Sequence, residues 1–232
     1  MIDDWSRTAE QLMLATIESK IRVVAVTSPI SGAGVTTVAR GLAATFARAG
    51  RATLLIDLSG TVHEGNQQGW RPGEPVPADA IKMGENGLAV MTVVPSASSR
   101  ALFGNVALLT QAFQTDLATY ASIILDLPAI DDTARDTLNP VAAARAADAV
   151  FLVGLTGLTL RGEMTDASQK LRQVGANVTG VILNDQYCAT LGEEIADVSY
   201  TRLGRFFPGV AHWLAQKALS IRFFGENFRI VR

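Results

Sequence analysis

A glycine-rich segment near the start of the chain carries residue types that bind phosphate. The stretch VVAVTSPISGAGVTT, residues 23–37, runs from an apolar segment through small residues into a helical pattern. A strand, a glycine-rich turn and a helix in this order direct backbone N–H groups toward an anion. Gly32 and Gly34 leave space for a phosphate, and the Thr36 hydroxyl is suited to magnesium. The alternative interpretation is a tight strand-to-helix turn without a ligand.

The segment departs from the phosphate-binding P-loop at its charged residue. That pattern has G-K-[ST] at the start of the helix, and its lysine reaches the nucleotide phosphates. Val35 stands at this position here. Loss of one preorganised donor costs about 3–4 kcal/mol of transition-state stabilisation, or roughly 10²–10³ in rate. Arg40, one turn into the helix, and Lys82 are the two side chains that could supply a substitute cation.

Polar residues follow several apolar runs that read as strands. Thr27, Asp57, Asp126 and Asn184 lie at or near the ends of such runs. Ligands of parallel α/β sheets bind beyond the carboxyl ends of the strands. Thr36, Asp57 and Asp126 are therefore the candidate magnesium ligands, although aspartates at strand ends can also serve only as helix caps. Asn184 is either a contact to a nucleotide base or a turn residue.

The apolar runs alternate with helical patterns. Six runs lack polar alternation, as parallel strands covered on both faces do: residues 22–28, 52–58, 88–94, 121–127, 149–155 and 178–184. Between them lie helical stretches near residues 36–49, 100–119, 133–147 and 160–175. We predict a single doubly wound α/β domain with a mainly parallel sheet. The irregular insert 59–86 is expected to be functional or mobile, with EGNQQGW as a solvated loop.

Three parts of the chain differ in character. Residues 1–20 predict an amphipathic N-terminal helix over 3–18, residues 21–185 the α/β core, and residues 186–232 a basic, aromatic helical tail. Residues 200–232 have a net charge of +5, whereas the whole chain has −2. A helix over 209–224 would place much of its apolar surface on one side. Such a helix packs on its own core or a partner, or lies on an anionic membrane.

Composition narrows the function classes. The net charge of −2 gives no sign of nucleic-acid binding, and no apolar run is long enough to span a bilayer. The start MIDDWSRTAEQ does not read as a signal peptide. The single cysteine, Cys188, cannot form a disulfide within the chain. These features favour a cytoplasmic protein, or one held peripherally at the inner membrane by its tail.

Four motifs in order carry a family resemblance. The segment TSPISGAGVTTVARGLAATFARAGRATLLIDLS resembles the P-loop region of the MinD/ParA group, and more closely that of BY-kinases, the bacterial tyrosine kinases of capsule and exopolysaccharide export. YASIILDLPAI is similar to the Walker B strand of that family, and VTGVILND to its later asparagine strand. The resemblance covers about residues 20–185. It implies a P-loop NTPase fold in which the nucleotide contacts are Ser31, Gly32, Ala33, Gly34, Val35, Thr36, Thr37 and Asn184.

The departures from the family pattern concern catalysis. Val35 replaces the P-loop lysine, and Ile30 stands at the additional lysine of the MinD/ParA branch. Ser59 replaces the second acidic residue after strand two. The chain has three tyrosines, Tyr120, Tyr187 and Tyr200, and no tyrosine-rich cluster to autophosphorylate. We therefore expect a pseudoenzyme with no catalytic residues that binds ATP or ADP with magnesium weakly or not at all.

By resemblance, the expected role is that of a regulatory or assembly subunit in polysaccharide biosynthesis and export. Its partner would be the inner-membrane co-polymerase or chain-length protein, with a homo-oligomer as a further form. One alternative is an active ATPase or tyrosine kinase that uses a substitute cation. The other is a MinD/ParA-like spatial regulator that residues 200–232 hold on the membrane.

Overall fold

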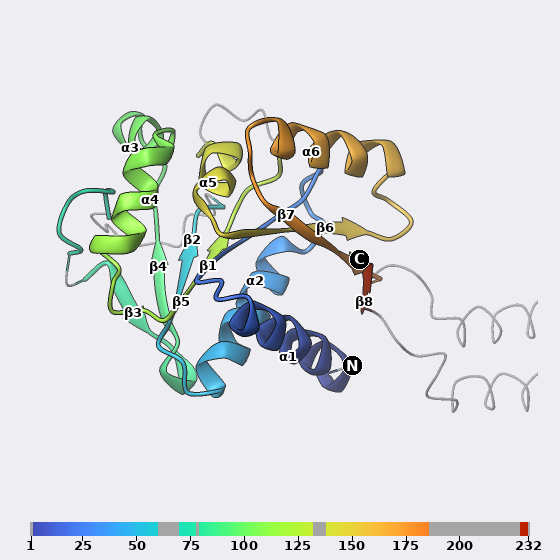
Figure 1. The fold of residues 1–232 in the computed structure, drawn as a ribbon, viewed down its shortest axis with the longest axis horizontal. Helices are drawn as coiled ribbons and strands as arrows, with labels where there is room; N and C mark the ends of the chain where they lie inside the picture. The colour runs from blue at the N-terminus through green and yellow to red at the C-terminus, as the bar shows by residue number, and fades with distance from the viewer. Residues whose placement is uncertain (1, 60–69, 78, 132–137, 186–227, 232) are drawn as a thin grey trace, which may run out of the picture.

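An eight-stranded sheet forms the centre of the structure, a computed structural model that describes residues 2–59, 70–77, 79–131, 138–185 and 228–231 (Figure 1). The strand order is β3-β4-β2-β5-β1-β6-β7-β8. The edge strands β3 and β8 pair in the antiparallel sense, and all other pairs are parallel. The strands are β1 Val23–Thr27, β2 Thr53–Asp57, β3 Ile81–Met83, β4 Ala89–Thr92, β5 Ser122–Asp126, β6 Ala149–Leu155, β7 Val178–Asn184 and β8 Phe228–Val231.

Helices cover both faces of this sheet, as Figure 1 shows. On one face α2 packs on β1, β2 and β5, and α1 packs on α2. The opposite face carries α4, α5 and α6, whose buried residues share one apolar cluster with the sheet. The helices are α1 Ile2–Glu18, α2 Val35–Arg48, α3 Ala97–Phe103, α4 Val106–Thr115, α5 Pro140–Ala146 and α6 Arg161–Gln173, with a short 3₁₀ turn, η1, at Glu85–Gly87. The predicted doubly wound, mainly parallel α/β fold is confirmed.

Alternate residues of the central strands enter two separate cores. In β1, Val23 and Ala25 join the cluster under α4–α6, whereas Val24 and Val26 join the cluster under α1 and α2. All five residues of β1, β2 and β5 are buried. This explains the unbroken apolar runs, because a strand covered on both faces has no side that favours polar residues.

The structure corrects several details of the sequence prediction. The single helix expected near 100–119 is two helices, because Asn105 caps α4 by accepting a hydrogen bond from the Leu108 N–H. Strands β3 and β8 were not predicted, and β8 lies within the segment assigned to the helical tail. Helix α5 begins at Pro140 rather than near 133; residues 132–137 lie outside the described residues, as does the predicted helix 209–224.

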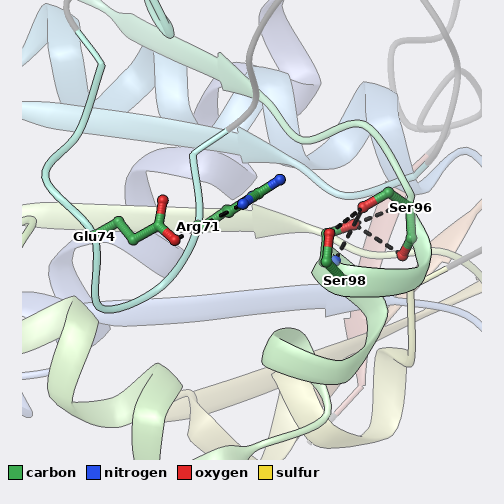
Figure 2. Close-up of polar contacts among 5 residues, drawn as sticks. Arg71, Glu74, Ser96 and Ser98 are labelled. Carbon is green, nitrogen blue, oxygen red and sulfur yellow. Dashed lines mark hydrogen bonds and ion pairs between the residues drawn. The ribbon is translucent and has the colours of Figure 1, made fainter.

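Trp70 shows that the insert is partly built into the core. Its side chain is fully buried, and its ring meets Phe103 edge to face, with ring centroids 5.9 Å apart. The expectation of a solvated loop was therefore wrong for this residue. Arg71 and Glu74, which follow, form an exposed ion pair at 3.9 Å (Figure 2).

A cluster of serine residues stabilises the start of α3. Figure 2 shows Ser96 and Ser98 at the beginning of this helix. The Ser99 N–H donates to the Ser96 hydroxyl at 3.0 Å, and the Ser96 N–H donates to the Ser99 hydroxyl at 2.7 Å. This reciprocal pair is a capping box, which satisfies backbone donors at the helix start. The cluster is thus explained by local structure and requires no catalytic role.

Candidate functional site

The glycine-rich loop connects β1 to α2 at the carboxyl edge of the sheet. Gly32 and Gly34 have φ angles of 81° and 91°, the left-handed region that favours glycine. Gly34 is the N-cap residue of α2 and has no side chain with which to cap this helix end. A Cβ atom at Gly32 would meet no atom of the described residues within 4 Å, so these residues leave open space on that side of the loop. The backbone N–H groups at the start of α2 can therefore donate hydrogen bonds to an anion.

The side chain of Asn184 forms a hydrogen bond with the backbone of this loop. Its side chain is 2% exposed, and its amide nitrogen donates to the Ala33 carbonyl at 3.0 Å. A Cβ atom at Gly34 would collide with the same amide nitrogen. The end of β7 thus supports the loop directly, a role that the sequence did not indicate. Contact between Asn184 and a nucleotide base stays a prediction.

Two aspartates face one another across neighbouring strands. Asp57 ends β2 and Asp126 ends β5, and the two are paired in the sheet register. They are 1% and 0% exposed. Asp57 Oδ1 accepts hydrogen bonds from the Ser59 N–H and hydroxyl, at 3.0 and 2.6 Å. Asp57 Oδ2 and both carboxylate oxygens of Asp126 are buried without a hydrogen-bond donor among the described residues.

The environment of Asp126 raises its pKa to about 7. Burial is the largest cause, because it disfavours the charged carboxylate. The negative charge of Asp57 acts in the same direction, while the nearby hydroxyl of Thr36 and the positive charge of Arg40 oppose it. A buried carboxylate of this kind is suited to a bound cation, which would satisfy its oxygens and lower its pKa.

Arg40 is the cation that the structure brings to the acid pair. Its guanidinium Nη2 lies 3.7 Å from Asp57 Oδ2, and its side chain is 49% exposed. Lys82, the other substitute considered, lies on the edge strand β3, which β4, β2 and β5 separate from β1. Val35 is half-buried and packs against the apolar cluster under α1 and α2. The position of the P-loop lysine therefore contributes apolar contact in place of charge.

The residues present fit a magnesium ion that is held jointly with phosphates. Thr36 and Asp57 lie near Asp126, and the Thr36 hydroxyl favours the charged form of this carboxyl, although neither Asp126 oxygen makes a hydrogen bond of standard geometry with the described residues. No three or more His, Cys, Asp or Glu side chains gather as a metal-binding group in the described parts of the chain. Magnesium commonly uses one or two carboxylates together with water and substrate phosphates, so a site with few protein ligands is consistent with it. Residues 31–37 would face the phosphates.

The fold is that of known nucleotide-binding proteins. The kinase domain of the Escherichia coli tyrosine kinase ETK superposes with a TM-score of 0.65 at 23% identity, covering 77% of this chain and 74% of that one. The VpsO kinase domain gives 0.63 at 24% identity, covering 76% and 90%. MinD from Pyrococcus horikoshii, solved with Mg-ADP, gives 0.54 at 20% identity, covering 72% of each chain.

These likenesses define the class of fold. The chain has the P-loop fold shared by BY-kinase domains and MinD-type proteins. No protein-family model and no curated protein matches the sequence. Among the helices in the described residues, none is long and apolar enough to cross a membrane.

Proposed function

We propose that this chain is a catalytically degenerate, BY-kinase-like P-loop protein that acts as a regulatory or assembly subunit. The observation that carries the proposal is Val35, an apolar side chain packed at the start of α2 where the P-loop has its lysine. The left-handed conformations of Gly32 and Gly34 support the proposal that the backbone of this loop can bind a phosphate. The site can therefore hold ATP or ADP weakly, with little catalysis.

The physical reason lies in the charge balance. Phosphoryl transfer depends mainly on positioning and on neutralising the phosphate oxygens. In this site Asp57 contributes negative charge, Asp126 does so once it has lost its proton, and Arg40 is paired with Asp57 at 3.7 Å. A cation that compensates a carboxylate is less available to a phosphate group. Magnesium, when bound with nucleotide, would supply positive charge to the phosphates, and Thr36 and Asp126 would hold it.

The proposed cellular role follows from the resemblance to BY-kinases. The subunit would serve polysaccharide biosynthesis and export in the cytoplasm, at the inner membrane, with the co-polymerase or chain-length protein as partner. Support comes from the sequence motifs and from the structural likeness to the kinase domains of ETK and VpsO. Contact of residues 200–232 with the membrane and assembly of a homo-oligomer are further parts of the proposal. A MinD/ParA-like spatial regulator at the membrane is an alternative to this role, and the structural likeness to MinD supports it.

A second candidate function is an active ATPase or kinase. The position of Arg40 favours it, because a half-exposed guanidinium beside the acid pair could turn toward a phosphate. In that case Arg40 would replace the P-loop lysine as the group that stabilises the transition state.

Calorimetry and turnover measurements separate the two. We expect ATP and ADP to bind weakly in the presence of magnesium, and ATP hydrolysis to be no faster than in Asp126→Ala. Hydrolysis that both Asp126→Ala and Arg40→Ala abolish, with Arg48→Ala as an active control, would establish the enzyme instead. Arg48 suits this purpose because it lies in the last turn of the same helix and donates to Thr45.

A further inference from the structure

Three buried carboxylate oxygens at the edge of the sheet have no hydrogen-bond donor among the described residues. They are Asp57 Oδ2 and both oxygens of Asp126, on side chains that are 1% and 0% exposed. Buried acceptors of this kind are costly unless a donor or a cation satisfies them. Asp57 and Asp126 are neighbours on adjacent strands, so a single cation placed between them could interact with both side chains.

The side chain of Arg40 places a positive charge next to this pair of aspartates. Its Nη2 atom approaches Asp57 Oδ2, one of the three oxygens, at 3.7 Å. Arg40 lies on α2, four residues after Thr36, so the two residues lie on the same face of the helix, one turn apart. A guanidinium keeps its charge at all physiological pH values, whereas a bound metal can dissociate.

We propose that Arg40 is a built-in cation at the Asp57–Asp126 pair that competes with divalent metal for these carboxylates. The inference rests on the proposed function, since it concerns the same site, and adds to it a reason for weak magnesium binding. A metal ion placed at Asp57 Oδ2 would lie close to the guanidinium, and the two positive charges would repel each other. Metal binding therefore requires Arg40 to move away from the pair.

Manganese binding in the absence of nucleotide tests this directly. Titration of the full chain, followed by the electron paramagnetic resonance of free Mn²⁺, should show weak binding in the unmodified protein. Arg40→Ala should bind Mn²⁺ about tenfold more tightly or better, because one repelling charge is removed. Arg48→Ala, which removes the same charge from the far end of α2, should bind as the unmodified protein does. Arg40→Lys should keep binding weak.

A double variant tests whether the gain in Mn²⁺ affinity depends on the Asp57 carboxylate. In Arg40→Ala/Asp57→Asn the added Mn²⁺ affinity should disappear, because the oxygen that Arg40 covers has become part of a neutral amide. A melting measurement gives a second readout: Mn²⁺ should raise the melting temperature of Arg40→Ala more than that of the unmodified protein. If Arg40→Ala does not fold, Arg40→Gln provides a neutral polar replacement for the same titration.

The proposal is overturned if the folded neutral variant binds Mn²⁺ no more tightly than the unmodified protein. It is also overturned if Arg48→Ala produces the same gain, or if the gain persists without the Asp57 carboxylate. Because the probe is the metal alone, failure of nucleotide binding leaves these outcomes unaffected. Tight Mn²⁺ binding by the unmodified protein would contradict the competition itself.

Discussion

Asn184 and Gly34 are fitted to each other at the junction of β7 and the glycine-rich loop. The amide nitrogen of Asn184 lies where a Cβ atom of residue 34 would stand, and it donates to the neighbouring Ala33 carbonyl at 3.0 Å. The loop conformation thus depends on a residue about 150 positions later in the chain. This relationship allows the geometry of the loop to be tested without any ligand.

Gly34→Ala should destabilise the protein more than Gly32→Ala. Both residues have a positive φ, which costs other residues roughly 1–2 kcal/mol. Only at Gly34 would the new methyl group also collide with Asn184. Urea unfolding measures the two costs. In an Asn184→Ala background, where that collision is absent, Gly34→Ala should cost little more than Gly32→Ala. Equal costs for the two glycines in the unmodified background would contradict the fit.

The elevated pKa of Asp126 predicts a specific pH dependence of stability. In the folded protein the carboxyl keeps its proton up to about pH 7, whereas in the unfolded chain it loses the proton near its ordinary pKa of 3.8. The free energy of unfolding should therefore fall as the pH rises from about 4 to about 7, and this contribution should level off above that range. The total change is at most roughly 4 kcal/mol.

Asp126→Asn isolates this contribution, because the amide does not titrate. Urea unfolding of both proteins from pH 4.5 to 8 should show the unmodified protein losing stability relative to Asp126→Asn as the pH rises. A difference that stays constant over this range would show that Asp126 ionises normally in the folded state.

Val35→Lys should strengthen nucleotide binding. The loop backbone already presents its N–H groups, and the lysine would add a charged contact worth about 1.5–3 kcal/mol, or roughly 10–150-fold in affinity. Hydrolysis should stay low because Ile30 and Ser59 are unchanged. Val35→Met, which is long but uncharged, is the control for calorimetry with ATP. A folded lysine variant that binds ATP no better than the methionine variant would show that the loop is not a nucleotide site.

Deletion of residues 200–232 should cause aggregation. The deletion removes β8, whose backbone pairs with β7 from Val181 to Asn184. The N–H and C=O groups of β7 would then form an open sheet edge, which promotes association between chains. Light scattering during thermal melting measures the effect, and deletion of 228–232 alone tests the contribution of the strand. A truncated protein that melts cooperatively without aggregation would favour a tail that acts elsewhere.

The sequence revealed most of the fold because its central strands are buried on both faces. Six apolar runs correspond to β1, β2, β4, β5, β6 and β7. Strand β3 has three residues, with Lys82 and Met83 exposed, so it has no apolar pattern to detect. Strand β8 follows a segment whose aromatic and basic residues favoured a helix. The break between α3 and α4 did have a signal, since Gly104 and Asn105 are typical of a helix end and a helix start.

The site was predictable as a set of residues but not as an arrangement. The loop, Asp57 and Asp126 follow from motif order, yet the position of the two aspartates side by side depends on β2 pairing with β5. Strand order is a property of the whole sheet, and no local pattern encodes it. Two further contacts also depend on the packing of the whole domain. Arg40 approaches Asp57 only when α2 packs on the sheet. Asn184 reaches the Ala33 carbonyl only when β7 has taken its place in the sheet.

The buried Trp70 gives the protein an internal optical reporter. An indole that is 0% exposed and meets the edge of Phe103 is shielded from water, so its fluorescence should be emitted at shorter wavelengths than that of a solvated tryptophan. The residue also joins the insert to the cluster that contains Leu109 and Phe113 of α4. In a variant with Trp5 and Trp213 replaced by phenylalanine, detachment of this part of the insert from the domain would therefore be visible as a red shift, even while the rest of the sheet stays intact.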